Sequence, residues 1–308
     1  MHDFAPLLVP TYDPAVLATG RYVIFGMLSV GLALSQFKEF RHYKIADWYQ
    51  ALLLGVIGNI FYYWVLAMCV KYSGAPIAGA FTAMIPILVA IIGNSQEKAP
   101  ERRVAWSSLV IPLSMIMVGM VCLNGTEFFY LVGSGRVSSS DFWIGVAFGA
   151  VSLFVWTWYP LKNAAWLQAN PARSPRSWAS AQGVALFPAA LSLLAYFWWS
   201  APAETGFFGD EPTKFILICV GLGIVCSWVG IALWNQMSLR LPRALGGQMI
   251  IFETIFAVIY AHIWRESWPS LLMTVGMTFL LVGIALAMRV FRRAREKVHV
   301  EVANSEAQ

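Results

Sequence analysis

The amino-acid sequence predicts an all-α integral membrane protein. Of its 308 residues, 59% are hydrophobic and 12% are charged, whereas soluble domains carry about twice that charged fraction. The apolar residues form runs of about 20, the length that an α-helix needs to cross the hydrocarbon core of a bilayer. Lys and Arg gather in alternate segments between these runs, as in polytopic proteins. Together these observations exclude a soluble globular fold.

Nine windows of high hydropathy predict membrane-spanning helices. Their approximate bounds, in chain order, are 17–36, 47–70, 74–93, 105–124, 142–162, 177–199, 214–236, 244–264 and 269–290. Trp and Tyr at many of their ends suit the aromatic belt at a membrane surface.

Turns, charges and prolines define the spans of the first half. Residues 1–16 are too short and too proline-rich for a span, and they lack the basic start and the cleavage site of a signal peptide. A basic turn at 38–44 ends the first span, and Lys71 follows the second. The third and fourth spans contain Pro86 and Pro112, which free carbonyl groups and bend helices.

Similar signals define the spans of the second half. Gly145 and Gly149 form a GxxxG pattern in the fifth span, which lets helix backbones approach closely in lipid. We expect Asn163 to lie at the membrane interface where this span ends. Pro188 bends the sixth span, and a basic turn at 240–243 joins the seventh to the eighth.

The positive charges define an orientation in the membrane. Of the 21 Lys and Arg residues, 16 fall in alternate loops and in the C-terminal segment, which the positive-inside rule assigns to the cytoplasm. They are Lys38, Arg41, Lys44, Lys98, Arg102, Arg103, Lys162, Arg173, Arg176, Arg240, Arg243, Arg289, Arg292, Arg293, Arg295 and Lys297. The net charge of +5 therefore orients the chain and does not indicate nucleic-acid binding.

One carboxylate, Glu253, lies near the middle of the span 244–264. An ionisable group at that depth costs at least about 2.5 kcal/mol unless it faces protein, water or a partner. Helical spacing brings Glu253 to one face with Met249, Phe256 and Tyr260. This setting suits proton exchange or pairing with a substrate ammonium, and the alternative is a protonated glutamate bonded to a neighbouring helix.

Two stretches in different halves of the chain resemble each other. They are WVLAMCVKYSGAPIAGAFTAMIPILVAIIG from Trp64 and LWNQMSLRLPRALGGQMIIFETIFAVIY from Leu233. In both, a helix end is followed by a tight basic turn, small residues and a second helix, and Pro86 matches Glu253. Such pairs indicate an internal repeat of the kind found in secondary transporters. The alternative is a chance likeness between two apolar hairpins.

A second match concerns the start of the chain, where residues 3–10 resemble residues 158–166. In that register the chain begins at the end of a helix. We therefore expect a ten-helix design whose first helix is missing or a stub, most simply because of a misassigned start codon. Five helices per half is an odd number, so the second half is inverted. The sequence thus predicts two inverted five-helix repeats, 1–135 and 136–291, and a cytoplasmic tail, 292–308.

Three stretches carry a family resemblance: GRYVIFG, LAMCVKYSGAPIAGAFTAMIPILVAIIG and GGQMIIFETIFAVIYAHIWRE. With them the chain resembles the EamA-type carriers of the drug/metabolite transporter superfamily over nearly its whole length. The resemblance implies ten helices, cytoplasmic termini, and export of amino acids, amines or drugs across an inner or plasma membrane. The sequence departs from the family pattern by lacking the first helix.

Two polar and aromatic stripes are candidates for a substrate site. Asn59 and Tyr63 share a face of the second span, and Trp228 and Asn235 share a face of the seventh. Facing one cavity, rings would cover the apolar body of a solute and amides would fix its polar groups. The alternative is that the rings pack and the amides join helices. Arg21 is a further candidate, for an anionic substrate group, and snorkelling to the membrane surface is its alternative.

No motif supports enzymatic chemistry. The chain has no GxxxxGK[ST], HExxH, GxSxG or CxxC sequence, and its four cysteines lie in apolar spans without metal-ligand spacing. We therefore predict no catalytic residue, metal or cofactor. The expected function is a secondary transporter that exports small metabolites by alternating access, with lipid and a small solute as partners. The alternative is a membrane sensor or structural subunit that does not transport.

Overall fold

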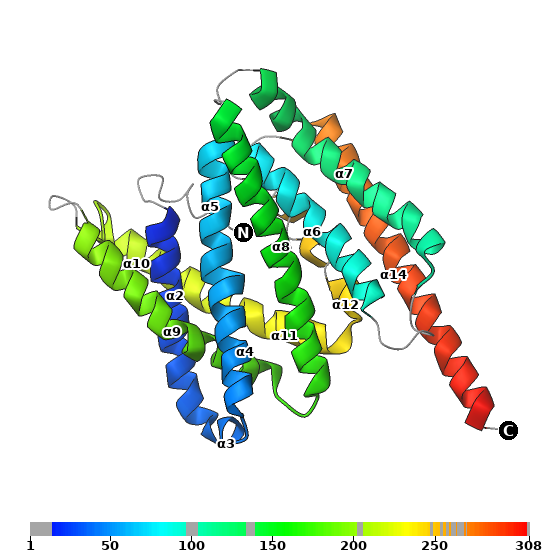
Figure 1. The fold of residues 1–308 in the computed structure, drawn as a ribbon, viewed down its shortest axis with the longest axis horizontal. Helices are drawn as coiled ribbons and strands as arrows, with labels where there is room; N and C mark the ends of the chain where they lie inside the picture. The colour runs from blue at the N-terminus through cyan, green and yellow to red at the C-terminus, as the bar shows by residue number, and fades with distance from the viewer. Residues whose placement is uncertain are drawn as a thin grey trace. The chain divides into compact units, whose positions relative to one another are not determined.

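The computed structural model describes residues 14–96, 104–133, 139–201, 206–246, 249–252, 255, 256, 259, 263, 268 and 270–306. Within these residues the regular structure is helical, with no strand, so the predicted all-α fold is confirmed (Figure 1). Seven helices of this part of the chain are long and apolar enough to cross a membrane, and a shorter apolar stretch covers Trp106–Cys122.

The helices, in chain order, are α2 (Pro14–Ser35), α3 (Phe37–Phe40), α4 (Ile45–Gly55), η1 (Val56–Phe61), α5 (Tyr62–Ser73), α6 (Ala75–Ser95), α7 (Trp106–Gly133), α8 (Ser139–Ala169), α9 (Pro175–Ser200), α10 (Pro212–Gly221), η3 (Leu222–Val229), α11 (Gly230–Arg240), α12 (Arg243–Gly246) and α14 (Leu271–Glu306). They cover eight of the nine predicted spans, and ten of the 21 residues of the span 244–264 lie outside the described residues. Helix α8 runs past its predicted end at 162 because the next helix-breaking pair is Asn170–Pro171.

The chain forms two compact units, and each unit combines two segments that are far apart in sequence. Unit 1 comprises residues 1–67 and 162–240, and unit 2 comprises residues 68–161 and 241–308. Each predicted repeat therefore contributes residues to both units. The repeat boundary near residue 135 stays a prediction.

In unit 1, α2 and α9 pack along each other (Figure 1). Two glycines allow this close approach: a Cβ atom on Gly183 would overlap the side chain of Ser29, and one on Gly26 would overlap the ring of Phe187. Small residues serve this purpose in membrane proteins, where lipid provides no hydrophobic drive between helices. The α2–α9 pair forms the base on which the other helices of unit 1 are arranged.

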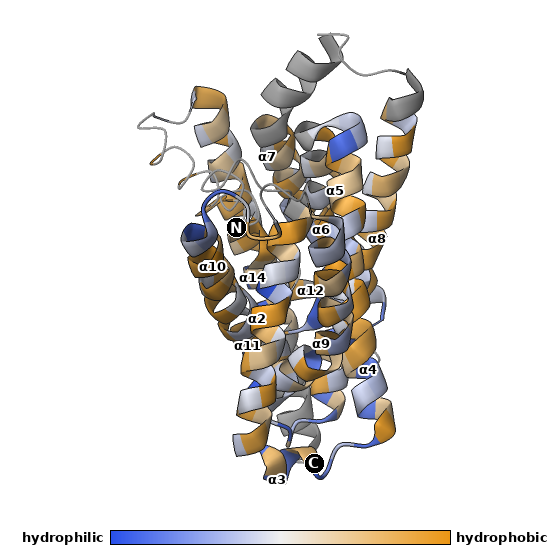
Figure 2. Cartoon of the chain, turned by 90° about the vertical axis from the view of Figure 1, so that its left-hand side faces the viewer, coloured by the Kyte–Doolittle hydropathy of each residue, from blue (hydrophilic) through white to orange (hydrophobic). Residues whose placement is uncertain are grey.

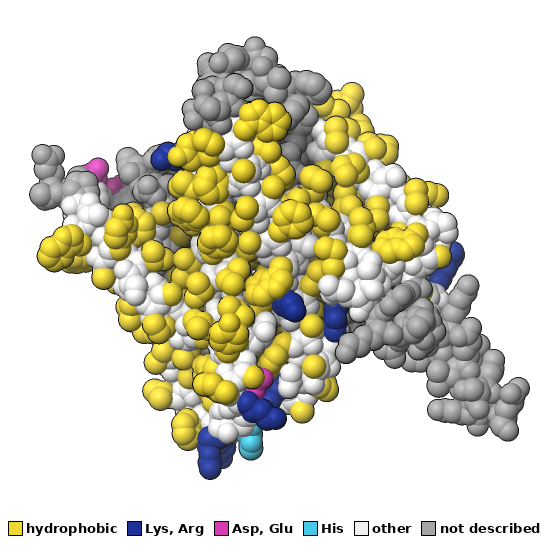
Figure 3. Space-filling view, viewed as in Figure 1, with side chains coloured by type: hydrophobic (Ala, Val, Ile, Leu, Met, Phe, Trp, Pro, Cys, Tyr) yellow, Lys and Arg dark blue, Asp and Glu magenta, His cyan; other side chains and the backbone are white. Residues whose placement is uncertain are grey.

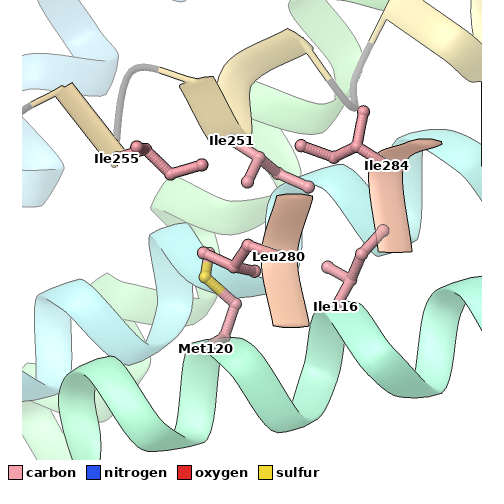
Figure 4. Packing of buried hydrophobic residues seen from close by; sticks show 6 residues of the cluster. All are labelled: Ile116, Met120, Ile251, Ile255, Leu280 and Ile284. Carbon is pink, nitrogen blue, oxygen red and sulfur yellow. The ribbon is translucent and has the colours of Figure 1, made fainter. Parts of the chain in front are cut away.

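In unit 2, α7 and α14 pack along each other in the same manner. A Cβ atom on Gly119 would lie 2.8 Å from the carbonyl oxygen of Gly276, so a glycine is needed there. Ile116 and Met120 on α7 and Leu280 on α14 form a buried apolar core together with residues such as Ile251 (Figure 4).

Two of the membrane-spanning helices have a π-helical centre. Residues Ile45–Ser73 form one span in which η1 lies between α4 and α5, and Pro212–Arg240 form another in which η3 lies between α10 and α11. Segments of π-helix are uncommon and are found frequently at functional sites. The two π-helical segments, η1 and η3, lie within unit 1.

The long helices consist mostly of apolar residues (Figure 2). Trp199 is 92% exposed, and Leu34, Tyr49 and Tyr196 are also largely exposed, as expected for surfaces that face lipid. Figure 3 shows hydrophobic side chains over most of one face, with basic and His side chains gathered near α3. This distribution agrees with a basic turn at one membrane surface.

Candidate functional site

Two of the predicted site residues, Tyr63 and Trp228, pack against one buried cluster in unit 1. The cluster consists of Ala18, Tyr22, Phe25, Leu186 and Ala190 from α2 and α9. Tyr63 comes from the span that contains η1, and Trp228 comes from η3 itself. The fold therefore brings rings from two spans onto the same α2–α9 base, and both rings are only partly buried.

Arg21 lies on α2 beside this cluster and is bonded inside unit 1. Its Nε donates to Ser227 Oγ at 2.7 Å, and its guanidinium carbon is 5.5 Å from the centre of the Tyr22 ring. A guanidinium within a span is costly unless protein or water solvates it. The hydrogen bond to the fully buried Ser227 supplies part of that solvation.

Asn59 and Trp228 have their polar atoms directed at protein groups. The Nδ2 of Asn59 donates to the carbonyl oxygen of Leu54 at 3.3 Å, and the residue is 8% exposed. The indole nitrogen of Trp228 donates to Ser180 Oγ on α9 at 3.1 Å. These bonds fix the orientation of both side chains.

Asn235 belongs to a different set of contacts, a fully buried polar network. Asn163 Nδ2 donates to Asn235 Oδ1 at 2.8 Å, and Asn235 Nδ2 donates to the carbonyl oxygen of Pro175 at 3.2 Å. Asn163 Oδ1 accepts from Trp178 Nε1 at 2.9 Å and from Gln182 Nε2 at 3.1 Å. The network joins α8, α9 and α11, which is the helix-joining alternative raised for Asn235.

The side chain of Asn163 is fully buried, although the sequence predicts the end of a span at this point. The hydropathy pattern ends the fifth span at residue 162. Helix α8 in fact continues to Ala169, so Asn163 sits inside the helix and against α9 and α11.

An aromatic cluster lies next to this network, at the turn between α3 and α4. Trp166 stacks on Trp178 with ring centres 3.4 Å apart, and its Nε1 donates to Asp47 Oδ1 at 3.0 Å. Tyr43 contacts both indoles edge-on, and its hydroxyl shares a hydrogen bond with Ser177 at 3.0 Å. Burial raises the pKa of Tyr43 to about 12.

Arg173, one of the basic loop residues, is held by the same turn. Its guanidinium carbon lies 4.9 Å from the centre of the Tyr43 ring. Its terminal nitrogens donate to the backbone carbonyl oxygens of Glu39 and His42. This positive charge therefore caps the turn that contains Glu39 and His42.

Glu253 lies outside the described residues. Among the residues around it, Met249 and Phe252 pack against the apolar core of unit 2. The part of the chain that the structure describes holds no group of three His, Cys, Asp or Glu residues suited to a metal ion.

Sequence reasoning missed Ser227, which links Arg21 to η3. Ser227 Oγ accepts from Arg21 and donates to the carbonyl oxygen of Leu222 at 3.2 Å. A signal for it exists, because LGVIGN at 54–59 resembles LGIVCS at 222–227. In that register Ser227 is the counterpart of Asn59.

Comparisons with known proteins identify the group to which the chain belongs. Residues 4–120 match the EamA-like transporter family. The "Inner membrane protein YtfF" of Escherichia coli (strain K12) is 32% identical over 288 residues, which cover 92% of this chain and 89% of that protein. A solved crystal structure of a protein with 14% sequence identity matches with a TM-score of 0.69, covers 94% of this chain and 93% of its own, and shows a shared fold. The chain is therefore a multi-pass inner membrane protein that belongs to the EamA-like transporters of the drug/metabolite transporter superfamily.

Proposed function

We propose that the protein is a secondary carrier that exports small metabolites, such as amino acids, amines or drugs, by alternating access. Membership of a transporter family supports transport in general. The observation that carries the proposal is the grouping of Arg21, Tyr63 and Trp228 around the α2–α9 base of unit 1. Partly buried rings beside a cation suit an amphipathic solute with an aromatic or apolar body.

An inverted repeat of 1–135 and 136–291 supports alternating access within this proposal. The two segments of unit 1 correspond to each other in the register of the LGVIGN and LGIVCS match. Both π-helical centres fall in that register, because η1 aligns with 224–229, which lies within η3. Carriers built from repeats place equivalent, interrupted helices next to the substrate route.

Glu253 has the coupling role in the proposal. Its carboxyl group takes up a proton, or pairs with a substrate ammonium, and so makes movement of the solute dependent on charge. The C-terminal segment is cytoplasmic, in line with its basic residues, and solute moves outward.

The test is an export assay with a panel of amino acids, amines and cationic drugs. Cells expressing the chain are compared with cells carrying Glu253→Gln, Trp228→Ala or Trp199→Ala, all at matched amounts in the membrane. Trp199 is 92% exposed and serves as the control for tryptophan removal. We expect selective export that Glu253→Gln abolishes, Trp228→Ala weakens at least about tenfold, and Trp199→Ala leaves unchanged.

Other outcomes separate the parts of this proposal. Unchanged export by Glu253→Gln would contradict the coupling role of Glu253 but not the carrier function. Export that does not respond to a dissipated proton gradient would leave substrate pairing as the role of the carboxylate. No export of any solute, by protein shown to reach the membrane, would favour a sensor or structural subunit.

A further inference from the structure

The two π-helical segments of unit 1 share more than their helix type. Asn59 Nδ2 donates to the carbonyl oxygen of Leu54, five residues earlier, and Ser227 Oγ donates to that of Leu222, also five residues earlier. Both donors are buried, and the two pairs align in the register of LGVIGN and LGIVCS. The same side-chain-to-backbone bond therefore occurs at the same position of both segments.

A glycine follows the bonded leucine in both spans: Gly55 is the last residue of α4, directly before η1, and Gly223 lies within η3. A Cβ atom on Gly55 would lie 3.1 Å from the carbonyl oxygen of Gln182 on α9, and one on Gly223 would lie 2.9 Å from that of Arg21 on α2. Each π segment is thus anchored by a glycine against one of the two long helices that form the base of unit 1.

The π-helical backbone and the side-chain bond to it allow a span to bend at a point where a glycine packs it against a neighbouring helix. In a π-helix each carbonyl group bonds five residues ahead and not four, so one residue more is accommodated than in an α-helix. Polar side chains that bond a carbonyl of the preceding turn offer the backbone an alternative partner and often bend the helix. A carbonyl group that can accept from either a backbone amide or a side chain can change partners in lipid at little cost in free energy, because it is never left without a hydrogen bond.

We propose that η1 and η3 are paired bending points of the carrier, and that Asn59 and Ser227 are equivalent latches that hold each bend through Leu54 and Leu222. The proposal rests on the alternating access proposed above. It adds the places at which the two spans bend, and it gives Ser227 a second role: through Arg21, which it also bonds, a solute near the cation affects the η3 latch.

The first test deletes single residues. Removing Ile57 from η1 or Val225 from η3 takes out the extra residue and preserves the faces of the flanking α-helices. Removing Tyr49 from α4 or Leu217 from α10, which are 62% and 66% exposed, rotates one end of the span by about 100° and serves as the control. All four deletions are single, and the two control positions align with each other in the register of LGVIGN and LGIVCS.

We expect the π deletions to melt at or above the temperature of the parent protein and the controls to melt well below it. In hydrogen exchange, residues 54–61 or 222–229 of the π deletions should exchange about tenfold more slowly than in the parent. π deletions that melt as low as the controls, or that exchange at the parental rate, would overturn the proposal.

A second test uses substitutions and stays informative if a deletion fails to fold. Asn59→Leu and Ser227→Ala remove the latches, and we expect roughly three- to tenfold faster exchange of the same segment. Asn59→Ser installs the side chain used at the equivalent position and should keep the parental rate. Equal exchange in Asn59→Leu and Asn59→Ser would contradict a latch.

The readouts separate this inference from the proposed function. Exchange rates report bending whether or not a transported solute is known. If the parent protein transports no solute but the latch variants still change hydrogen exchange, the bending points are supported and the carrier function is contradicted. If both π deletions transport normally, the bending points are contradicted and the carrier function is supported.

Discussion

Asn163 and Asn235 are joined side chain to side chain at 2.8 Å, and neither residue exposes any surface. With Trp178 and Gln182 donating to the same amide oxygen of Asn163, three polar groups depend on one residue. A satisfied amide network of this kind joins helices in a membrane protein, where each unmet hydrogen bond is costly. Asn163 is therefore the central residue of the network.

Replacing Asn163 by Ala should destabilise the protein by about 2–4 kcal/mol, because it leaves buried groups of Trp178, Gln182 and Asn235 without this partner. Asn170→Ala is the matched control, since the side-chain amide of Asn170 bonds the carbonyl oxygen of Trp166 in the helix that it ends. Melting temperatures in one detergent measure both. Equal losses in the two variants would mean that the network adds nothing beyond a single hydrogen bond.

Asn94, near the end of α6, should hold the backbone of Val104 in place. Its Nδ2 donates to the carbonyl oxygen of Val104 at 3.0 Å, and its Oδ1 accepts from the Val104 amide at 2.9 Å. We expect Asn94→Ala to cost about 2 kcal/mol and to speed amide exchange at Val104, because both bonds are buried. Ser95→Ala, at an exposed neighbour, should change neither quantity. Parental exchange at Val104 in Asn94→Ala would contradict this assignment.

Glycine variants should separate close helix packing from helix propensity. Gly183→Ala places a methyl group against Ser29 and Phe25, so we expect a loss of about 2 kcal/mol or more. Gly31→Ala meets nothing within 4 Å and should be neutral or stabilising by up to about 1 kcal/mol. The melting temperatures of the two variants are compared with that of the parent protein. Equal changes in melting temperature would show that α2 and α9 tolerate separation.

Alkaline pH should weaken the aromatic cluster at the α3–α4 turn. The pKa of Tyr43 is raised to about 12 by burial, above its value of about 10 in an unfolded chain. The phenol therefore contributes stability that is fully present below about pH 10 and is lost as the pH rises toward 12. A difference of two units corresponds to roughly 2–3 kcal/mol. Tyr43→Phe, which cannot ionise, should melt with less dependence on pH between 10 and 12, and an identical pH profile would show that Tyr43 does not ionise on unfolding.

The sequence by itself determined the class of the protein and most of its helices. Long apolar runs have one stable solution in lipid, the α-helix, because every backbone group must be bonded within its own segment. For that reason eight predicted spans correspond to helices between α2 and α14. Helix ends were less accurate, as at Asn163, because hydropathy marks where the membrane ends and not where the helix does.

Only the tertiary structure decided which polar residues meet. Arg21 and Ser227 lie 206 positions apart, and Asn163 and Asn235 lie 72 apart, so helical spacing within one span could not pair them. Their distances depend on α2 and α9 packing through glycines and on the other helices of unit 1 resting on that pair. The physical reason is that a periodic pattern specifies the face of a helix, whereas the partner of that face is set by packing between helices that the chain brings together from both of its halves.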